Sequence, residues 1–148
     1  MENFIPKRYI PRFLTRKDRI KQRKNIVKSR RLYKRGTYFA RPKVKSFKSK
    51  PSGHVATAKR LYKVDTIKPS PTLAKKTGCS IGALRKIVNK GEGAYYSSGS
   101  RPNQTASSWG YARLASSITG GPASKVDYDI LKDGCKPSSR ALKLAIKK

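Results

Sequence analysis

Hydrophobic positions are unevenly distributed along the 148 residues of this chain. Residues 1–58 contain little periodic hydrophobicity, whereas apolar residues recur at helical spacing from residue 59 onward. We therefore expect a mainly α protein in two parts. An extended basic N-terminal arm, residues 1–58, is followed by a compact, mainly helical module of short helices, residues 59–148. The module should hold most of a modest core, because so short a segment buries little apolar surface.

The arm combines two predicted kinds of structure. Residues 1–14 contain two prolines and should be extended. Thr15, with Asp18 three residues later, is typical of a helix start, so a helix is predicted over residues 15–35. Its apolar stripe is thin, and such a helix needs a partner to be stable. Residues 37–53 are predicted to form a loop or a short strand.

Capping and breaking residues divide the module into short helices. Helices should begin where serine, threonine or proline precedes an apolar stretch and end at glycines. Five helices are predicted. The first starts at Ser70-Pro71, the second spans residues 81–89, and the third starts at Thr105 or Ser107. The fourth spans residues 126–132, and the fifth spans residues 140–147. Gly91 and Gly93 are expected to end the second of these, so residues 94–104 are predicted to form a loop.

Residues 73–91 have the spacing of a helix-turn-helix. Gly78 suits the tight turn, and Ser80 suits the cap of the second helix. In a DNA-reading protein, Ser80, Arg85 and Lys86 would face the major groove. The same spacing is typical of a tight helical hairpin that touches no DNA, and the pattern favours this structural interpretation.

Charge is the strongest constraint on function. Lysines and arginines number 37 against 7 acids, which gives a formal net charge of +30. Residues 1–60 contain 21 of these cations, opposed by Glu2 and Asp18, and thus carry about +19 of the total. A field of this size attracts polyanions: nucleic acid, an anionic lipid surface or the acidic faces of protein partners.

The side chains that catalysis requires are scarce. A nucleophile needs an adjacent base, and the single histidine, His54, has no carboxylate or cysteine beside it. Asp127 and Asp129 are separated by one residue, and on a helix they would point in different directions. No set of residues has the spacing of metal ligands. We expect no enzyme, no metal and no cofactor.

Cys79 and Cys135 are too few for a disulfide framework and form no CxxC motif. Free thiols in a reducing compartment are the expected state, and a single bridge that closes the loop between them is the alternative. No stretch is apolar for long enough to cross a membrane. The first residues lack the apolar core of a signal peptide. The sequence therefore predicts a protein that is made and used on the cytosolic side, or in something assembled there.

Three stretches carry a resemblance to a known family. They are KGEGAYYSSGSRPNQTASSWGYARLASSITGGPASKVDYDIL, the preceding LAKKTGCSIGALRKIVNKG, and the N-terminal YIPRFLTRKDRIKQRKNIVKSRRLYKRGTYFARPKVKSFKSK. Together they resemble an uncharacterised family of small basic proteins from nucleocytoplasmic large DNA viruses, found in algal-virus and mimivirus-like genomes. The resemblance brings no catalytic activity and no site residues. It implies a protein of the virion, made in the host cytoplasm and located on the inner side of the capsid shell.

In that setting we expect a non-enzymatic structural protein, a minor capsid (cement) protein whose arm threads between or beneath capsid proteins. Its partners would be the major capsid protein, other minor capsid proteins and the inner-membrane surface. Aromatic and arginine side chains dominate such interfaces. The arm residues expected to bind are Phe4, Arg8, Tyr9, Arg12, Phe13, Arg30, Arg31, Tyr33, Arg35, Tyr38 and Phe39. The alternative is a viral nucleic-acid-binding or packaging protein that neutralises genomic DNA.

Overall fold

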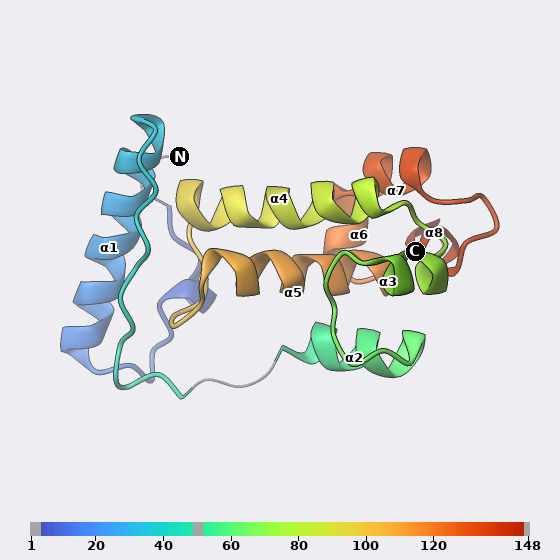
Figure 1. The fold of residues 1–148 in the computed structure, drawn as a ribbon. Coiled ribbons are helices and arrows are strands. Elements are labelled where there is room, and N and C mark those ends of the chain that lie inside the picture. Colours follow the sequence, from blue (N-terminus) through green and yellow to red (C-terminus); the bar gives the residue numbers. More distant parts are fainter. Residues whose placement is uncertain (1–3, 49–51, 147–148) are drawn as a thin grey trace. The chain divides into compact units, whose positions relative to one another are not determined.

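The computed structural model describes residues 4–48 and 52–146, and this part of the chain is mainly helical, as predicted (Figure 1). A short 3-10 helix, Lys7–Tyr9, precedes the α-helices. These are α1 (Arg16–Lys34), α2 (Gly53–Tyr62), α3 (Pro71–Thr77), α4 (Ile81–Ser97), α5 (Ala106–Ile118), α6 (Pro122–Val126), α7 (Tyr128–Gly134) and α8 (Arg140–Ile146). Within the described residues no segment forms a strand, and residues 37–48 are irregular or turn.

Contacts divide the chain into two compact units that differ from the predicted arm and module. Unit 1 comprises residues 1–50 and 92–109, and unit 2 comprises residues 51–91 and 110–148. The boundaries fall inside α4 and inside α5, so both helices contribute to both units. The N-terminal segment is therefore not a separate extended arm, because it forms one folded unit with residues 92–109.

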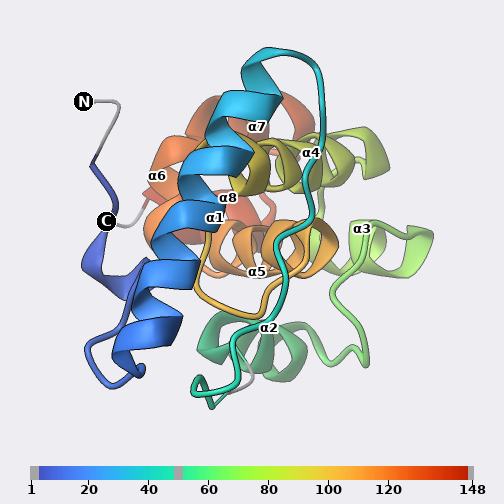
Figure 2. The same cartoon turned by 90° about the vertical axis from the view of Figure 1, so that its left-hand side faces the viewer.

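In unit 1, α1 begins where the sequence predicts. The Thr15 hydroxyl accepts a hydrogen bond from the Asp18 amide at 3.2 Å. After α1 the chain runs back along the helix (Figure 2). The Lys21 ammonium donates to the Lys43 carbonyl at 3.3 Å, and the Ser46 amide donates to the Asp18 carboxylate at 2.8 Å. The returning segment is thus fixed to the first turns of α1.

Unit 1 has a small apolar core of its own. Tyr9 and Ile26 are buried, and the Tyr9 ring packs edge-on against Trp109 with centroids 5.8 Å apart. Gly99 has a φ of 128°, and a Cβ at this position would lie 3.2 Å from side-chain atoms of Tyr9 and Ile26. Contrary to the prediction of an extended start, Ile5 and Tyr9 are buried, and a turn of 3-10 helix forms at Lys7–Tyr9.

Arg41 is a buried cation at the centre of a polar network in unit 1. Its guanidinium lies 3.8 Å from the centroid of the Tyr95 ring. It donates to the Ser29 hydroxyl at 3.0 Å, the Tyr95 carbonyl at 2.6 Å and the Ser100 hydroxyl at 2.8 Å. The Arg41 amide donates to the Tyr95 hydroxyl at 3.0 Å. Burial lowers the pKa of Arg41 from its ordinary value, and the group stays protonated at neutral pH.

In unit 2, α3 and α4 form the predicted helix-turn-helix hairpin. The Ser70 hydroxyl caps α3 by accepting from the Leu73 amide at 3.1 Å. Leu73 and Ile87 are fully buried beneath the hairpin. Gly78 takes the turn with a φ of 78°, and a Cβ there would lie 2.6 Å from the Ser139 Cβ. Glycine is required at this turn for both its conformation and its size.

The prediction that glycines end α4 near residue 91 is wrong. The helix continues through Gly91 and Gly93 to Ser97. A Cβ at Gly91 would lie 2.7 Å from the Gly110 Cα, so the missing side chain lets α4 and α5 approach closely, and Figure 1 shows the two helices side by side. This tertiary contact outweighs the poor intrinsic helix propensity of glycine.

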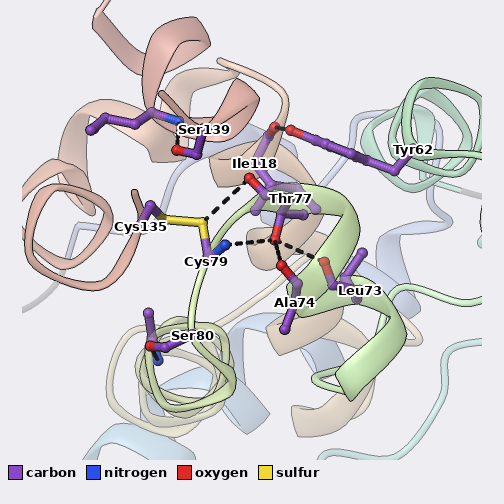
Figure 3. Close-up of a disulfide and its surroundings, with 11 residues drawn as sticks. Tyr62, Leu73, Ala74, Thr77, Cys79, Ser80, Ile118, Cys135 and Ser139 are labelled. Atoms are coloured by element: carbon purple, nitrogen blue, oxygen red, sulfur yellow. Dashed lines mark hydrogen bonds between the residues drawn. A yellow bond between two sulfur atoms is a disulfide. The ribbon is translucent and has the colours of Figure 1, made fainter. Parts of the chain in front are cut away.

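No helix is predicted for residues 53–62, yet α2 forms there. The Ser52 hydroxyl accepts from the Val55 amide at 3.4 Å, and the helix buries Ala58 and Tyr62 one turn apart. The Tyr62 hydroxyl donates to the Ile118 carbonyl (Figure 3), and burial raises the pKa of Tyr62 to about 12. Burial of this face, rather than a periodic sequence pattern, stabilises the helix.

The single helix predicted over residues 126–132 is two helices, α6 and α7. Pro122 starts α6 earlier than expected, as proline favours the first turn of a helix. Asp127 has φ −97° and ψ 14°, which interrupts the helix before α7 begins. The last helix is capped as predicted, because the Ser139 hydroxyl accepts from the Leu142 amide at 3.3 Å. Its predicted last residue, Lys147, lies outside the described residues.

Cys79 and Cys135 form a disulfide, so the expectation of free thiols is wrong (Figure 3). Their Cα atoms are 3.8 Å apart and belong to an isolated antiparallel bridge. Backbone hydrogen bonds flank the pair: the Ser80 amide donates to the Gly134 carbonyl at 2.8 Å, and the Lys136 amide donates to the Gly78 carbonyl at 2.9 Å. The bridge ties the turn of the hairpin to the end of α7.

Replacing Arg41 should destabilise unit 1. The substitution Arg41→Met keeps the aliphatic stem but leaves Ser29, Tyr95 and Ser100 without their charged donor. We expect a loss of about 2–4 kcal/mol of unfolding free energy, measured by urea denaturation. Lys45→Met, at an exposed position in the same segment, is the matched control. Equal unfolding curves for the two variants would contradict this role for Arg41.

Reduction of the disulfide should destabilise unit 2. The bridge joins residues 56 positions apart, and a loop of that length constrains the unfolded chain by about 4 kcal/mol. We expect reductant to lower the thermal midpoint of the wild-type protein and to leave a Cys79→Ser, Cys135→Ser double variant unchanged. An identical midpoint for oxidised and reduced wild type would show that the bridge contributes nothing.

Candidate functional site

The solvent-facing side of α1 is the most highly charged surface of unit 1. The helix is 19 residues long and contains ten lysines and arginines and one acid, Asp18. Its exposed cations are Arg16, Lys17, Lys21, Arg23, Lys24, Lys28, Arg31 and Lys34. Residues seven apart, such as Lys17, Lys24 and Arg31, recur on one side of a helix. These exposed cations are named the α1 basic face, and they extend along about 28 Å of helix.

The single acid of α1 offsets only a small part of this charge, since ten lysines and arginines share the helix with it. The Asp18 carboxylate accepts hydrogen bonds from both the amide and the hydroxyl of Ser46, on the side of the helix where the returning chain packs. The Ser46 hydroxyl and then its amide lower the pKa of Asp18 below the ordinary value. The carboxylate is therefore committed to fixing the fold of unit 1.

A shallow hollow of about 290 Å³ lies on the first half of α1. Its walls come from Ile10, Arg19, Ile20, Arg23 and Lys24. Three cations and two aliphatic side chains make a surface that suits an anionic group better than a neutral apolar one. The hollow is open to solvent and extends the positive surface of α1.

Two of the six aromatic residues predicted to bind a partner are packed inside unit 1 instead. Tyr9 is buried, as described above, and Phe39 is half-buried with the Lys28 ammonium 4.5 Å from its ring centroid. Phe13 is 64% exposed, although one side of its ring stacks on Phe47 at 5.7 Å. Phe4 is also 64% exposed. Only part of the predicted aromatic set is therefore available to a partner.

The arginines that were predicted to bind a partner differ from one another in their surroundings. Arg8 lies over the Tyr9 ring at 4.9 Å, and the Arg30 guanidinium donates to the Ser98 carbonyl at 2.8 Å. Arg12, Arg31 and Arg35 are exposed. Arg31 and Arg35 lie one turn apart at the C-terminal end of α1, so the structure brings them together with the α1 basic face.

Three tyrosines form a cluster where α1 ends. The ring centroids of Tyr33 and Tyr38 are 5.9 Å apart, those of Tyr38 and Tyr96 are 5.0 Å apart, and the Tyr33 and Tyr96 planes differ by 6°. Tyr33 and Tyr38 are among the residues predicted to bind a partner, whereas Tyr96 is not. No local sequence signal links Tyr96 to α1, since more than sixty residues separate them.

The residues predicted to face DNA do not form an uninterrupted basic surface on the hairpin. Ser80 caps α4 by accepting from the Ala83 amide at 3.1 Å, and Arg85 and Lys86 are exposed. Lys86 shares a shallow groove of about 310 Å³ with Asp129 and Asp133 of α7. Two carboxylates beside this face oppose the approach of phosphate groups. The arrangement favours a structural hairpin over a DNA-reading one.

Asp127 is the most deeply buried acid of the described residues. It accepts hydrogen bonds from two guanidinium nitrogens of Arg113 at 3.0 and 2.7 Å and from the Ser117 hydroxyl at 2.8 Å, and Lys90 lies 3.4 Å away. Burial raises the pKa of Asp127, but these hydrogen bonds and charges outweigh it and hold the pKa below the ordinary value. The group is therefore the ion-pair partner of Arg113.

Within residues 4–48 and 52–146, none of the helices is long and apolar enough to span a membrane. No three histidine, cysteine or acidic side chains gather there in a way that could hold a metal ion.

The sequence profile of a family of unknown function, DUF5824, matches residues 6–133. The chain belongs to this family. The match includes all of α1, the hairpin and the 92–109 segment of unit 1, but it assigns no activity, substrate or partner. No curated protein and no solved structure matches the chain. The viral setting implied by the resemblance stays a prediction.

The substitution Asp127→Asn should destabilise unit 2, because an amide of equal size leaves Arg113 without its charged partner. We expect a loss of about 2–4 kcal/mol at neutral pH. Since the folded pKa of Asp127 lies below its unfolded value of about 3.9, the wild-type advantage is full above that pH and declines as the pH falls below it. Urea denaturation of both proteins between neutral and acidic pH measures this difference.

Asp129→Asn, at an exposed position on α7, is the control and should change stability little. A difference between wild type and Asp127→Asn that persists unchanged at acidic pH would show that charge is not the reason for the loss.

Proposed function

We propose that this protein is a non-enzymatic nucleic-acid-binding protein that contacts the phosphate backbone through the α1 basic face. The observation that carries the proposal is the density of cations on one exposed helix side whose only acid is bound to Ser46. Neutralising such a face releases counterions from a nucleic acid, which supplies most of the affinity in sequence-independent binding. The expected mode is therefore binding with little sequence preference.

Nucleic acid suits this surface better than a lipid bilayer. The exposed large aliphatic residues of α1 are Ile20 and Val27, at 47% and 42% exposure. Helices that lie in a membrane interface need a broad apolar face opposite their cations. Two partly exposed aliphatic side chains surrounded by lysines and arginines do not provide one.

A role as a minor capsid protein is the second candidate. It is favoured by Phe4 and Phe13, whose 64% exposure would allow them to enter grooves of a protein partner. The expectation of this role relied on aromatic anchors all along the N-terminal segment. Because Tyr9 and Phe39 pack within unit 1, that support is weaker than the sequence suggested. Binding to acidic capsid surfaces would use the same α1 basic face.

Reversing charge on the α1 basic face should weaken binding to nucleic acid. The test variant is the triple substitution Lys17→Glu, Lys24→Glu, Arg31→Glu, measured by fluorescence anisotropy on a labelled duplex over a range of salt concentrations. We expect at least about tenfold weaker binding at physiological ionic strength. The log–log salt slope should fall by about 3, because each lost phosphate contact removes roughly one counterion.

A charge-matched control removes the effect of net charge. The triple substitution Lys59→Glu, Lys75→Glu, Lys76→Glu changes the formal charge equally at exposed positions of unit 2. If both variants lose affinity and slope to the same extent, binding depends on overall charge, and the proposal of a specific face on α1 is wrong.

A further inference from the structure

The tyrosine cluster of unit 1 has an unusually exposed member. Tyr38 is 70% exposed, the largest value among the exposed large hydrophobic residues described. Tyr33 is 36% exposed, and Tyr96 is half-buried. The cluster therefore presents an aromatic face to solvent although its three rings already contact one another.

The rings are held in place from behind. Tyr96 follows Tyr95, whose ring packs at 86° against it and also lies under the Arg41 guanidinium. The Tyr96 carbonyl accepts from the Ser29 hydroxyl of α1 at 2.9 Å. Burial, and then the neighbouring Tyr95 and Glu92, raise the pKa of Tyr96 above its ordinary value. An aromatic surface on so rigid a support loses little side-chain entropy when it binds a ligand.

Cations lie close in the sequence to each tyrosine of the cluster, and the charge of Arg41 acts on Tyr96. Arg30 reaches the carbonyl of Ser98, two residues after Tyr96, and Arg35 follows Tyr33 by two residues. Lys28 lies over the ring of Phe39, the neighbour of Tyr38. The nearby acid is Glu92, which accepts from the Ser107 hydroxyl at 3.5 Å. The surroundings are positively charged, so an aromatic ligand that carries phosphates is better suited than a neutral one.

We infer that Tyr33, Tyr38 and Tyr96 form a stacking platform for unpaired bases of single-stranded nucleic acid. An exposed ring beside a basic surface is the arrangement that binds single strands without sequence preference: bases stack on the ring while phosphates contact the cations. In a duplex the bases are stacked on one another and cannot reach Tyr38. The inference rests on the proposed nucleic-acid function and adds a preference for single strands to it.

The test compares wild type with Tyr38→Ala on two labelled ligands, an oligothymidylate and a duplex of equal length, by fluorescence anisotropy at physiological ionic strength. We expect about tenfold weaker binding of the single strand, in line with the loss of one stacked base. Binding of the duplex should change less than about twofold. Tyr38→Phe keeps the ring and should bind both ligands as the wild type does.

Val126→Ala is the control for loss of an exposed apolar side chain, since Val126 is 67% exposed on α6 of unit 2. This variant should leave the affinities for both ligands unchanged. Ultraviolet crosslinking of wild type to the oligothymidylate, read by mass spectrometry, should modify Tyr38 or its two neighbours in the cluster. This readout needs no variant and so does not depend on whether Tyr38→Ala folds.

The outcomes separate the two proposals. If wild type binds both ligands and Tyr38→Ala weakens neither or weakens both equally, the platform is wrong and the basic-face proposal stands. If wild type binds neither ligand measurably at physiological ionic strength, the nucleic-acid function itself is wrong. Crosslinks confined to lysine-rich segments outside the cluster would also overturn the platform.

Discussion

Unit 1 depends on the burial of Arg41. A guanidinium removed from water needs hydrogen bonds on every side, and here hydroxyls, a carbonyl and an aromatic ring supply them. Those acceptors belong to α1, to the end of α4 and to the loop after it, so satisfying one cation fixes three segments at once. This explains why residues 1–50 and 92–109 form one unit although they are far apart in the sequence.

Charged groups in unit 1 have two different settings. Arg41 is buried and held by hydrogen bonds to uncharged groups. Asp18 is the one acid of α1, whereas eight lysines and arginines of that helix are exposed. Mutual repulsion among them destabilises the folded unit. A polyanion that binds the folded state would relieve this repulsion and stabilise the unit, so binding and folding should be coupled.

Local rules predict the helix starts and fail on the long-range contacts. Thr15, Ser70 and Ser139 each cap a helix as the sequence indicates, because a cap is decided within three residues. The continuation of α4 past Gly91 depends on Gly110, and the pairing of Cys79 with Cys135 depends on a fold that brings them together. The α1 basic face could be predicted from composition. The cluster that joins Tyr96 to Tyr33 could not, because the contact is tertiary.

The disulfide also explains why the hairpin of unit 2 is a weak candidate for reading DNA. Cys135 lies directly after α7, and its bond to Cys79 ties that end of α7 to the turn before α4. Asp133 and Asp129 precede it on α7 and line the groove with Lys86. The constraint that holds the turn in place thus also holds two carboxylates beside the face a DNA reader would use. The α1 basic face has one acid against ten cations on its helix, so under the proposed function it is the surface that a phosphate backbone would meet first.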